Sequence, residues 1–271
     1  DLLMRVAREH PQALVYPITV TSSTASAARK KAAKRIIDEM EKTHPDLVKE
    51  AKLVSGEMMA VAITWHETWY QGLEDAANMY FTEKDQQGML DKLGELHATW
   101  SSVDRVSETM RVLSFIHSYG RDLHEAWNWI EKFKVSGAAV HVNQAWELYT
   151  TVFRKIKKQI MKLDELHLEH VSPKLAIAED LTLAVPGTYS ETYKNHTQSV
   201  VRIQSFLPSV TVIVSKQRPR RMSIVGSDGK TYQFLLKGHE DLRQDERVMQ
   251  LFGLINVLLD KTIGIAKLGV K

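Results

Sequence analysis

The sequence has 271 residues, of which 44% are hydrophobic and 25% are charged, and this composition is ordinary for a soluble globular protein of one to three domains. The net charge of +3 is too small to indicate nucleic-acid binding, and the absence of cysteine excludes a disulfide framework and a cysteine-based metal site. Because the sequence contains no run of about 18 apolar residues, we expect no transmembrane helix.

The first segment, residues 1–56, is predicted to be helical. Pro11 and Pro17 are expected to interrupt its first helix, because proline removes a backbone donor. A basic helix follows from Ala27 to Lys42, and we interpret its lysines and arginines as a solvated face, with an anion-binding patch as the alternative. The chain starts with neither an initiator methionine nor a signal-peptide pattern, so we expect it to be a piece of a longer protein.

Four helical patterns occupy residues 57–160. The first places apolar residues at spacings of three and four in one continuous stripe from Met58 to Tyr80. The other three cover about Asp85–Trp100, Glu108–Lys134 and His141–Ile156. Because the loops between these patterns are short, we predict an antiparallel four-helix bundle.

The hydrophobic period changes after a connector at residues 161–186. In residues 187–271, alternating and β-branched runs predict a twisted antiparallel sheet, with a hairpin at the Asp228–Gly229 pair. A helix with one apolar face follows from about Asp245 to Leu259. The predicted fold class is therefore multidomain: helices, then a four-helix bundle, then an α+β unit of a sheet and a helix.

A lysine after the last predicted strand is the strongest candidate for chemistry. Lys237 ends the apolar run Tyr232–Leu236, and carboxylates follow at Glu240 and at Asp245, where the helix begins. A flexible lysine needs a nearby carboxylate to fix its stem before it can present its ammonium to nucleotide phosphates. The pattern predicts that Lys237 pairs with Asp245 or Glu240 at a nucleotide site, with a weak surface ion pair as the alternative.

The sequence around this lysine resembles the phosphatidylinositol-3-kinase-related protein kinases, and most of all the target of rapamycin (TOR) kinases. The resemblance rests on Leu235–Gly253 and on the run Ser215–Arg221. It implies a kinase small lobe that binds ATP with Mg²⁺, in which Lys237 stabilises phosphate charge and Asp245, helped by Glu240, orients the lysine. Ser215 is implied to contact phosphate. Four more residues are implied to lie near the nucleotide: Ile213, Gln217, Pro219 and Leu235.

Two features of the sequence do not by themselves indicate a complete kinase site. By themselves, the four basic residues within 216–221 are typical of a solvated turn. The catalytic loop of a protein kinase is also not found, since Tyr119–Leu123 only resembles its His-Arg-Asp-Leu motif and has Trp127 where the asparagine belongs. We expect the large lobe and the magnesium ligands beyond Lys271, and this chain alone to be inactive. No metal site is predicted, because no pair of histidines has a complete ligand set.

The predicted bundle resembles the FKBP–rapamycin-binding bundle of the TOR kinases. The motifs that carry this resemblance are Trp65–Trp69, Met79–Phe81, Ser118–Asp122 and Gln144–Tyr149. A second apolar stripe on the fourth helix, offset by one residue from the core stripe, indicates an exposed groove, with burial against a neighbouring domain as the alternative. We assign eight residues to this groove: Leu73, Ala77, Tyr80, Phe81, Trp146, Glu147, Thr150 and Phe153.

The groove departs from the family pattern at four positions. The chain has Ala77 for serine, Asn143 for threonine, Glu147 for aspartate and Thr150 for tyrosine. The missing ring at Thr150 removes an apolar contact worth about 1 kcal/mol or more if buried. We therefore expect the FKBP–rapamycin complex to be a partner that this chain binds with reduced affinity.

The start of the chain, around His10–Pro17, resembles the end of the FAT helices that precede the bundle in TOR kinases. The predicted order is the end of the FAT region at 1–56, the rapamycin-binding bundle at 57–160, the connector at 161–186 and a partial kinase small lobe at 187–271.

The resemblance implies a serine/threonine protein kinase that transfers the γ-phosphoryl group of ATP to protein substrates in growth and nutrient signalling. It implies TOR-complex regulatory subunits as partners and a cytoplasmic location, with peripheral association at endomembrane surfaces. The alternative from a different class is a non-enzymatic binding module whose bundle groove recruits ligands or substrates. A lipid kinase is a third reading, because the kinase fold is shared.

Overall fold

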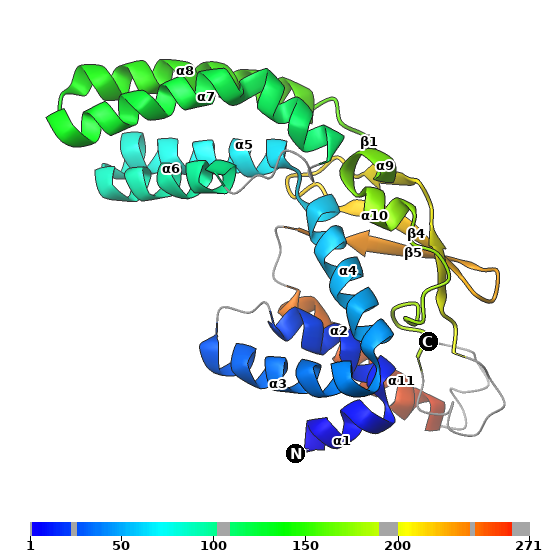
Figure 1. Cartoon of the computed structure of the whole chain (residues 1–271). Helices are drawn as coiled ribbons and strands as arrows, with labels where there is room; N and C mark the ends of the chain where they lie inside the picture. The colour runs from blue at the N-terminus through cyan, green and yellow to red at the C-terminus, as the bar shows by residue number, and fades with distance from the viewer. Residues whose placement is uncertain (1, 23–25, 102–108, 190–199, 239–241, 262–271) are drawn as a thin grey trace.

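The structure, a computed structural model, describes residues 2–22, 26–101, 109–189, 200–238 and 242–261. A long helical bundle forms one end of the molecule, and the other elements gather around an antiparallel sheet at the opposite end (Figure 1). The predicted fold class, helices followed by a sheet with a helix, is confirmed. Of the helices in the described part, none combines the length and the apolar character of a membrane span.

Four helices precede the bundle: α1 (Leu2–Glu9), α2 (Pro11–Ser22), α3 (Ala27–Thr43) and α4 (Pro45–Ala62). Pro11 begins α2, but the expectation that Pro17 interrupts this helix is wrong, because Pro17 lies inside α2. The backbone donor that Pro17 lacks would have served the carbonyl of Ala13. Ala13 is exposed, so water can satisfy that carbonyl and the helix continues.

The junction between α4 and α5 (Trp65–Asn78) contains a break that hydrophobic periodicity did not reveal. The predicted continuous stripe from Met58 to Tyr80 is wrong, because α4 ends at Ala62 and α5 starts after Thr64. Thr64 and Glu67 form a capping box, in which the Thr64 backbone donates to Glu67 Oε2 at 2.9 Å and Thr64 Oγ1 accepts from the Glu67 backbone at 3.4 Å. This Thr-x-x-Glu pattern is a known helix-start signal, so the break was present in the sequence.

The bundle consists of α5, α6 (Gln86–Ser101), α7 (Met110–Ser136) and α8 (Ala139–Ile160), with a short π-helix, η1 (Met79–Glu83), directly after α5. The predicted second, third and fourth helices are thus confirmed, and the four lie side by side (Figure 1). α7 ends at Gly137, whose φ of 64° is a left-handed conformation that glycine adopts without strain. The helices enclose an aromatic core around Trp69, Phe115 and Tyr149.

The sheet comprises β1 (Glu165–His167), β2 (Ile203–Phe206), β3 (Ser209–Val212), β4 (Arg220–Gly226) and β5 (Thr231–Leu236), paired antiparallel throughout. β4 pairs with β2, β3 and β5, and the predicted hairpin forms with Gly229 at a φ of 75°. β1 and the short helices α9 (Leu168–Val171) and α10 (Pro173–Ala176) arise from residues that the sequence indicated only as a connector. A three-residue strand is too short for periodicity to show.

The molecule has two separate hydrophobic cores. One lies within the bundle, and the other joins the sheet to the N-terminal helices. Polar contacts reinforce the second core: Gln12 Nε2 donates to the Thr182 carbonyl at 2.7 Å, and Glu50 Oε2 accepts from the Leu183 backbone at 3.1 Å. The N-terminal helices and the sheet therefore form one body, to which α4 connects the bundle (Figure 1).

The last helix, α11 (Arg243–Lys261), forms as predicted but leaves its apolar face uncovered. Leu251 and Phe252 of that face are 54% and 51% exposed. No element of the described part packs closely against this face.

Because the bundle has its own core, we predict that residues 57–160 fold alone. Circular dichroism should show a helical spectrum and one cooperative thermal transition. Phe115→Ala should lower the free energy of unfolding by about 3–5 kcal/mol, since Phe115 is fully buried. Val135→Ala is the control, because Val135 is 91% exposed and should change little. A segment without helix, or equal effects of both substitutions, would contradict this prediction.

Bundle stability should fall as the pH falls from 7 to 5. Burial lowers the pKa of both His66 and His97 to about 4, assisted by the positive charge of Arg111 near His66 and of His124 near His97. The unfolded histidines take up protons near pH 6.5 while the folded ones do not, so acid favours unfolding by on the order of 2 kcal/mol per histidine.

Urea unfolding of the 271-residue chain, followed by tryptophan fluorescence at several pH values, measures this loss. All six tryptophans lie in the bundle sequence, so the signal reports on the bundle. His97→Gln should flatten the pH dependence, whereas the control His167→Gln, on β1, should leave it unchanged. A pH dependence that His97→Gln does not alter would count against the assignment of His97.

Candidate functional site

One face of the sheet is uncovered and carries three of the predicted nucleotide-site residues. The strand register places Leu235 opposite Arg221, and Arg221 opposite Thr211. Because alternate residues share a face, Ile213 and Lys237 continue this row just beyond the strand ends. The other face is buried at Arg220, Met222 and Ile224, whereas Ile213 and Leu235 are 39% and 50% exposed.

Lys237 and Asp245 lie close together in the structure. Lys237 Nζ is 3.8 Å from Asp245 Oδ2, and the lysine side chain is the more buried of the two. Asp245 lies in the first turn of α11, where a carboxylate is also favoured by the helix dipole. Glu240, the other predicted partner of Lys237, lies outside the described residues. The structure thus brings the lysine and one acid together, and their catalytic role stays a prediction.

The predicted phosphate-contacting hairpin is a closed loop between β3 and β4. The Ile213 backbone donates to the Pro219 carbonyl at 2.9 Å, and the Arg218 backbone donates to Ser215 Oγ at 3.1 Å. Arg218 has a φ of 47°, a left-handed conformation that a non-glycine residue adopts only when neighbours hold it. Ser215 is exposed, while Gln217 and Pro219 are half-buried.

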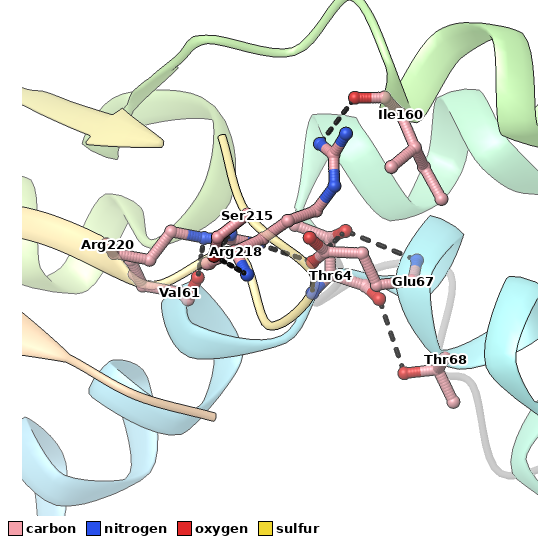
Figure 2. A network of polar contacts seen from close by, with 8 residues as sticks. All are labelled: Val61, Thr64, Glu67, Thr68, Ile160, Ser215, Arg218 and Arg220. Carbon is pink, nitrogen blue, oxygen red and sulfur yellow. Dashed lines mark hydrogen bonds and ion pairs between the residues drawn. The ribbon is translucent and has the colours of Figure 1, made fainter. Parts of the chain in front are cut away.

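The reading of residues 216–221 as a solvated turn is wrong for Arg220, which is fully buried. Figure 2 shows its guanidinium between the bundle and the loop. Arg220 Nη2 forms an ion pair with Glu67 Oε2, Nη1 donates to the Arg218 carbonyl, and Nε donates to the Val61 carbonyl at 3.3 Å. Burial raises the pKa of Glu67, but the hydrogen bond and charge of Arg220 outweigh it and hold that pKa below its usual value.

A half-polar cleft of about 380 Å³ lies beside this network, between the bundle and the loop. It is lined by Glu67, Tyr70, Gln71, Ile160, Lys216, Gln217 and Arg218. Sequence reasoning missed both the cleft and the Glu67–Arg220 pair, because the two residues are 153 positions apart. The capping box was the available signal at Glu67, but it indicates a helix start and not a distant partner.

The predicted groove residues gather on α5, η1 and α8. Leu73 and Trp146 are buried, so the expectation of an exposed stripe is wrong for Trp146. The rings of Tyr80 and Phe81 lie against it, with centroids 6.3 and 5.3 Å from that of Trp146. Farther along α8, Phe153 stacks on Tyr70 at 4.7 Å.

The rim of this aromatic cluster is open. Ala77, Tyr80 and Phe153 are half-buried, whereas Phe81, Glu147 and Thr150 are exposed. The π-helix η1 carries Tyr80 and Phe81, and such turns often occur at functional sites. The structure therefore brings the predicted groove residues together as a buried floor with an exposed rim.

A further cavity of about 310 Å³, which the sequence did not suggest, lies at the junction of α4 and α5. Its lining is mainly apolar and includes Ile63, Trp69 and Val112 together with Arg111. Within the described residues, the Trp69 and Arg111 Nε atoms have no hydrogen-bond partner.

The donor set on the open sheet face suits a nucleotide. The exposed side chains of Ile213 and Leu235 offer apolar surface for a purine, and the Lys237 ammonium suits phosphates. Among the described residues, no group of three or more histidine, aspartate or glutamate side chains is placed to hold a metal ion.

Comparisons with known proteins agree on one family. Residues 57–158 match the model of the FKBP12-rapamycin binding domain. The chain is 49% identical over 259 residues to the serine/threonine-protein kinase mTor of Drosophila melanogaster. This alignment covers 96% of this chain and 10% of the fly protein. It is 50% identical over 259 residues to the kinase tor1 of Schizosaccharomyces pombe and 47% identical over 263 residues to the kinase TOR of Arabidopsis thaliana.

Those two alignments cover 96% and 97% of this chain, and 11% and 10% of the relatives. The chain thus spans about a tenth of the length of the curated relatives it matches. The matches extend over nearly all of the chain, the sheet with Lys237 included. The chain therefore belongs to the target of rapamycin kinase family, as a segment that contains the FKBP12-rapamycin binding domain of that family.

Proposed function

We propose that this chain is the part of a TOR-type serine/threonine protein kinase that holds ATP on its sheet and recruits ligands and substrates through its bundle. The intact enzyme transfers the γ-phosphoryl group of ATP to protein hydroxyls. The observation that carries the proposal is the Lys237–Asp245 ion pair at the end of an uncovered sheet face. The similarity to two serine/threonine-protein kinases, mTor of Drosophila melanogaster and tor1 of Schizosaccharomyces pombe, supports it.

The described residues have separable roles in this proposal. Ile213 and Leu235 offer the apolar surface for the base, while Lys237 neutralises phosphate charge and Asp245 orients the lysine. Ser215, Gln217 and Pro219 belong to the loop that is proposed to cover the phosphates; Glu240, the second proposed acid, lies outside the described residues. Bound Mg²⁺ would supply further neutralisation of phosphate charge.

The bundle favours a second role, recognition of partners, because its aromatic cluster has an exposed rim at Phe81, Glu147 and Thr150. We propose that this rim binds the FKBP12–rapamycin complex and, in the intact protein, guides protein substrates to the kinase site. Regulatory subunits of a TOR complex are further proposed partners. The proposed location is the cytoplasm, with peripheral association at endomembrane surfaces.

In the full-length enzyme, Lys237→Ala should abolish phosphoryl transfer, with a loss in kcat on the order of 100-fold or more, because phosphate charge is left uncompensated. Lys230→Ala is the matched control: Lys230 precedes the same strand, pairs with Asp228 and is 76% exposed. Kinase assays and thermal melting of both variants test this. Near-normal activity in a folded Lys237→Ala enzyme would overturn the site.

Thr150→Tyr should strengthen binding of the FKBP12–rapamycin complex. Thr150 lies one turn from both Trp146 and Phe153 on α8, so a tyrosine there adds a ring to the same rim. We expect the dissociation constant to fall about five- to tenfold, which corresponds to roughly 1 kcal/mol. Thr151→Tyr, at the neighbouring exposed position, is the control that should bind as the parent chain does.

Isothermal titration of FKBP12 with rapamycin into the 271-residue chain measures these affinities. Equal affinity of the parent chain and Thr150→Tyr would contradict the role of position 150. Absence of binding by all three proteins would contradict the bundle as the site of this complex.

A further inference from the structure

The hairpin loop at residues 213–219 is held from the bundle side, and not only by its own strands. Arg220, at the base of the loop, is fully buried, and each nitrogen of its guanidinium has an acceptor (Figure 2). One acceptor is the Val61 carbonyl in the last turn of α4, and another is the Glu67 carboxylate in the first turn of α5. The third is the carbonyl of Arg218 within the loop. One side chain therefore joins the loop to the α4–α5 junction.

A second contact holds the loop from another helix. Arg218 Nη1 donates to the Ile160 carbonyl at the end of α8, at 2.5 Å (Figure 2). The carboxyl end of a helix carries unpaired carbonyls and partial negative charge, so it suits a guanidinium. Arg218 also has a left-handed φ of 47° and donates its backbone N–H to Ser215 Oγ at 3.1 Å. The conformation of the loop around Ser215 is thus fixed by a residue that is fastened to the bundle.

The buried pair has the properties of a positioning device. Surface ion pairs hold geometry weakly, because water and salt compete for both charges. Glu67 and Arg220 are excluded from water, with exposures of 6% and 0%, so neither has an alternative partner in solvent. A carboxylate and a guanidinium at such a site constrain both distance and direction. The β4 end of the loop therefore keeps a fixed place relative to α5.

We propose that Glu67 and Arg220 are positioning residues for the nucleotide: they hold the 213–219 loop over the ATP phosphates from the bundle side. This inference rests on the proposed kinase function of the sheet. Neither residue contacts the reacting atoms. Their effect is on how closely the loop amides and Ser215 fit the phosphates, and so on the KM for ATP.

Glu67→Gln in the full-length enzyme is the sharpest test. Glutamine still serves the capping box with Thr64, because an amide oxygen accepts the same hydrogen bonds, but it removes the charge opposite Arg220. We expect the KM for ATP to rise about fivefold to tenfold, with kcat and the KM for the protein substrate within about twofold of the parent values. Arg220→Lys, which keeps one charge but not three directed donors, should act in the same way.

Two controls separate positioning from general stability. Thr109→Ala weakens a helix start on a different helix, α7, where the Thr109 side chain accepts from the Val112 backbone at 3.4 Å, so it should lower the melting temperature and leave the KM for ATP unchanged. Glu131→Gln makes the same chemical change in an exposed ion pair elsewhere on the bundle, and should alter neither quantity. Because Glu67 and Arg220 share one contact, the double variant should raise the KM for ATP by less than the product of the single effects.

Several outcomes would overturn the inference. A KM for ATP within about twofold of the parent value in folded Glu67→Gln and Arg220→Lys enzymes would do so. So would an equal rise in Thr109→Ala. If the buried variants fail to fold, Arg218→Ala decides, since it removes the contact with Ile160 without leaving a buried charge: a raised KM for ATP supports the inference and an unchanged one overturns it. A parent enzyme without kinase activity would overturn the proposed function as well, whereas an active parent with insensitive variants overturns this inference alone.

Discussion

Arg220 places a positive charge where water does not reach it, and the arrangement of the bundle against the sheet follows from the need to neutralise that charge. The partner is Glu67, on the first turn of a helix that belongs to a different core. Leaving one member of such a pair alone in the interior costs about 3–5 kcal/mol. The carboxylate must therefore stay within reach of the guanidinium, and this fixes where α5 begins relative to β4. A cleft lies beside this contact, lined by residues of the bundle and of the loop.

The division into two cores keeps the proposed recognition surface on the bundle apart from the proposed nucleotide site on the sheet. The bundle buries its own aromatic residues, so its rim remains open for a partner without loss of stability elsewhere. The sheet shares its core with the N-terminal helices, which leaves its opposite face exposed, with the half-buried Lys237 at the end of that face. α4 belongs to the sheet body and reaches the bundle, so the turn at Ile63 and Thr64 is the point at which the chain passes from one core to the other.

The candidate site was predictable to the extent that its signals are local. The strand pattern ended at Leu236 just before Lys237, and the acid spacing placed Asp245 at a helix start, because both depend on neighbours within a few residues. The groove residues were predicted as a group from helical spacing and from the family resemblance. Their burial was not, since the depth of Trp146 depends on how the rings of Tyr80 and Phe81 pack against it, and spacing within one helix carries no information about that.

The sequence by itself determined the last three helices of the bundle, the antiparallel sheet and its hairpin at Asp228–Gly229, because periodicity and turn chemistry act over a few residues. Only the tertiary structure decided that Arg220 is buried in a loop whose composition is typical of a solvated turn. It also decided that Pro17 lies within a helix and that the connector adds a strand to the sheet. The burial of Arg220 and the added strand depend on partners distant in sequence, and the helical position of Pro17 depends on access of water to one carbonyl. The local pattern of side chains does not indicate such partners or such access.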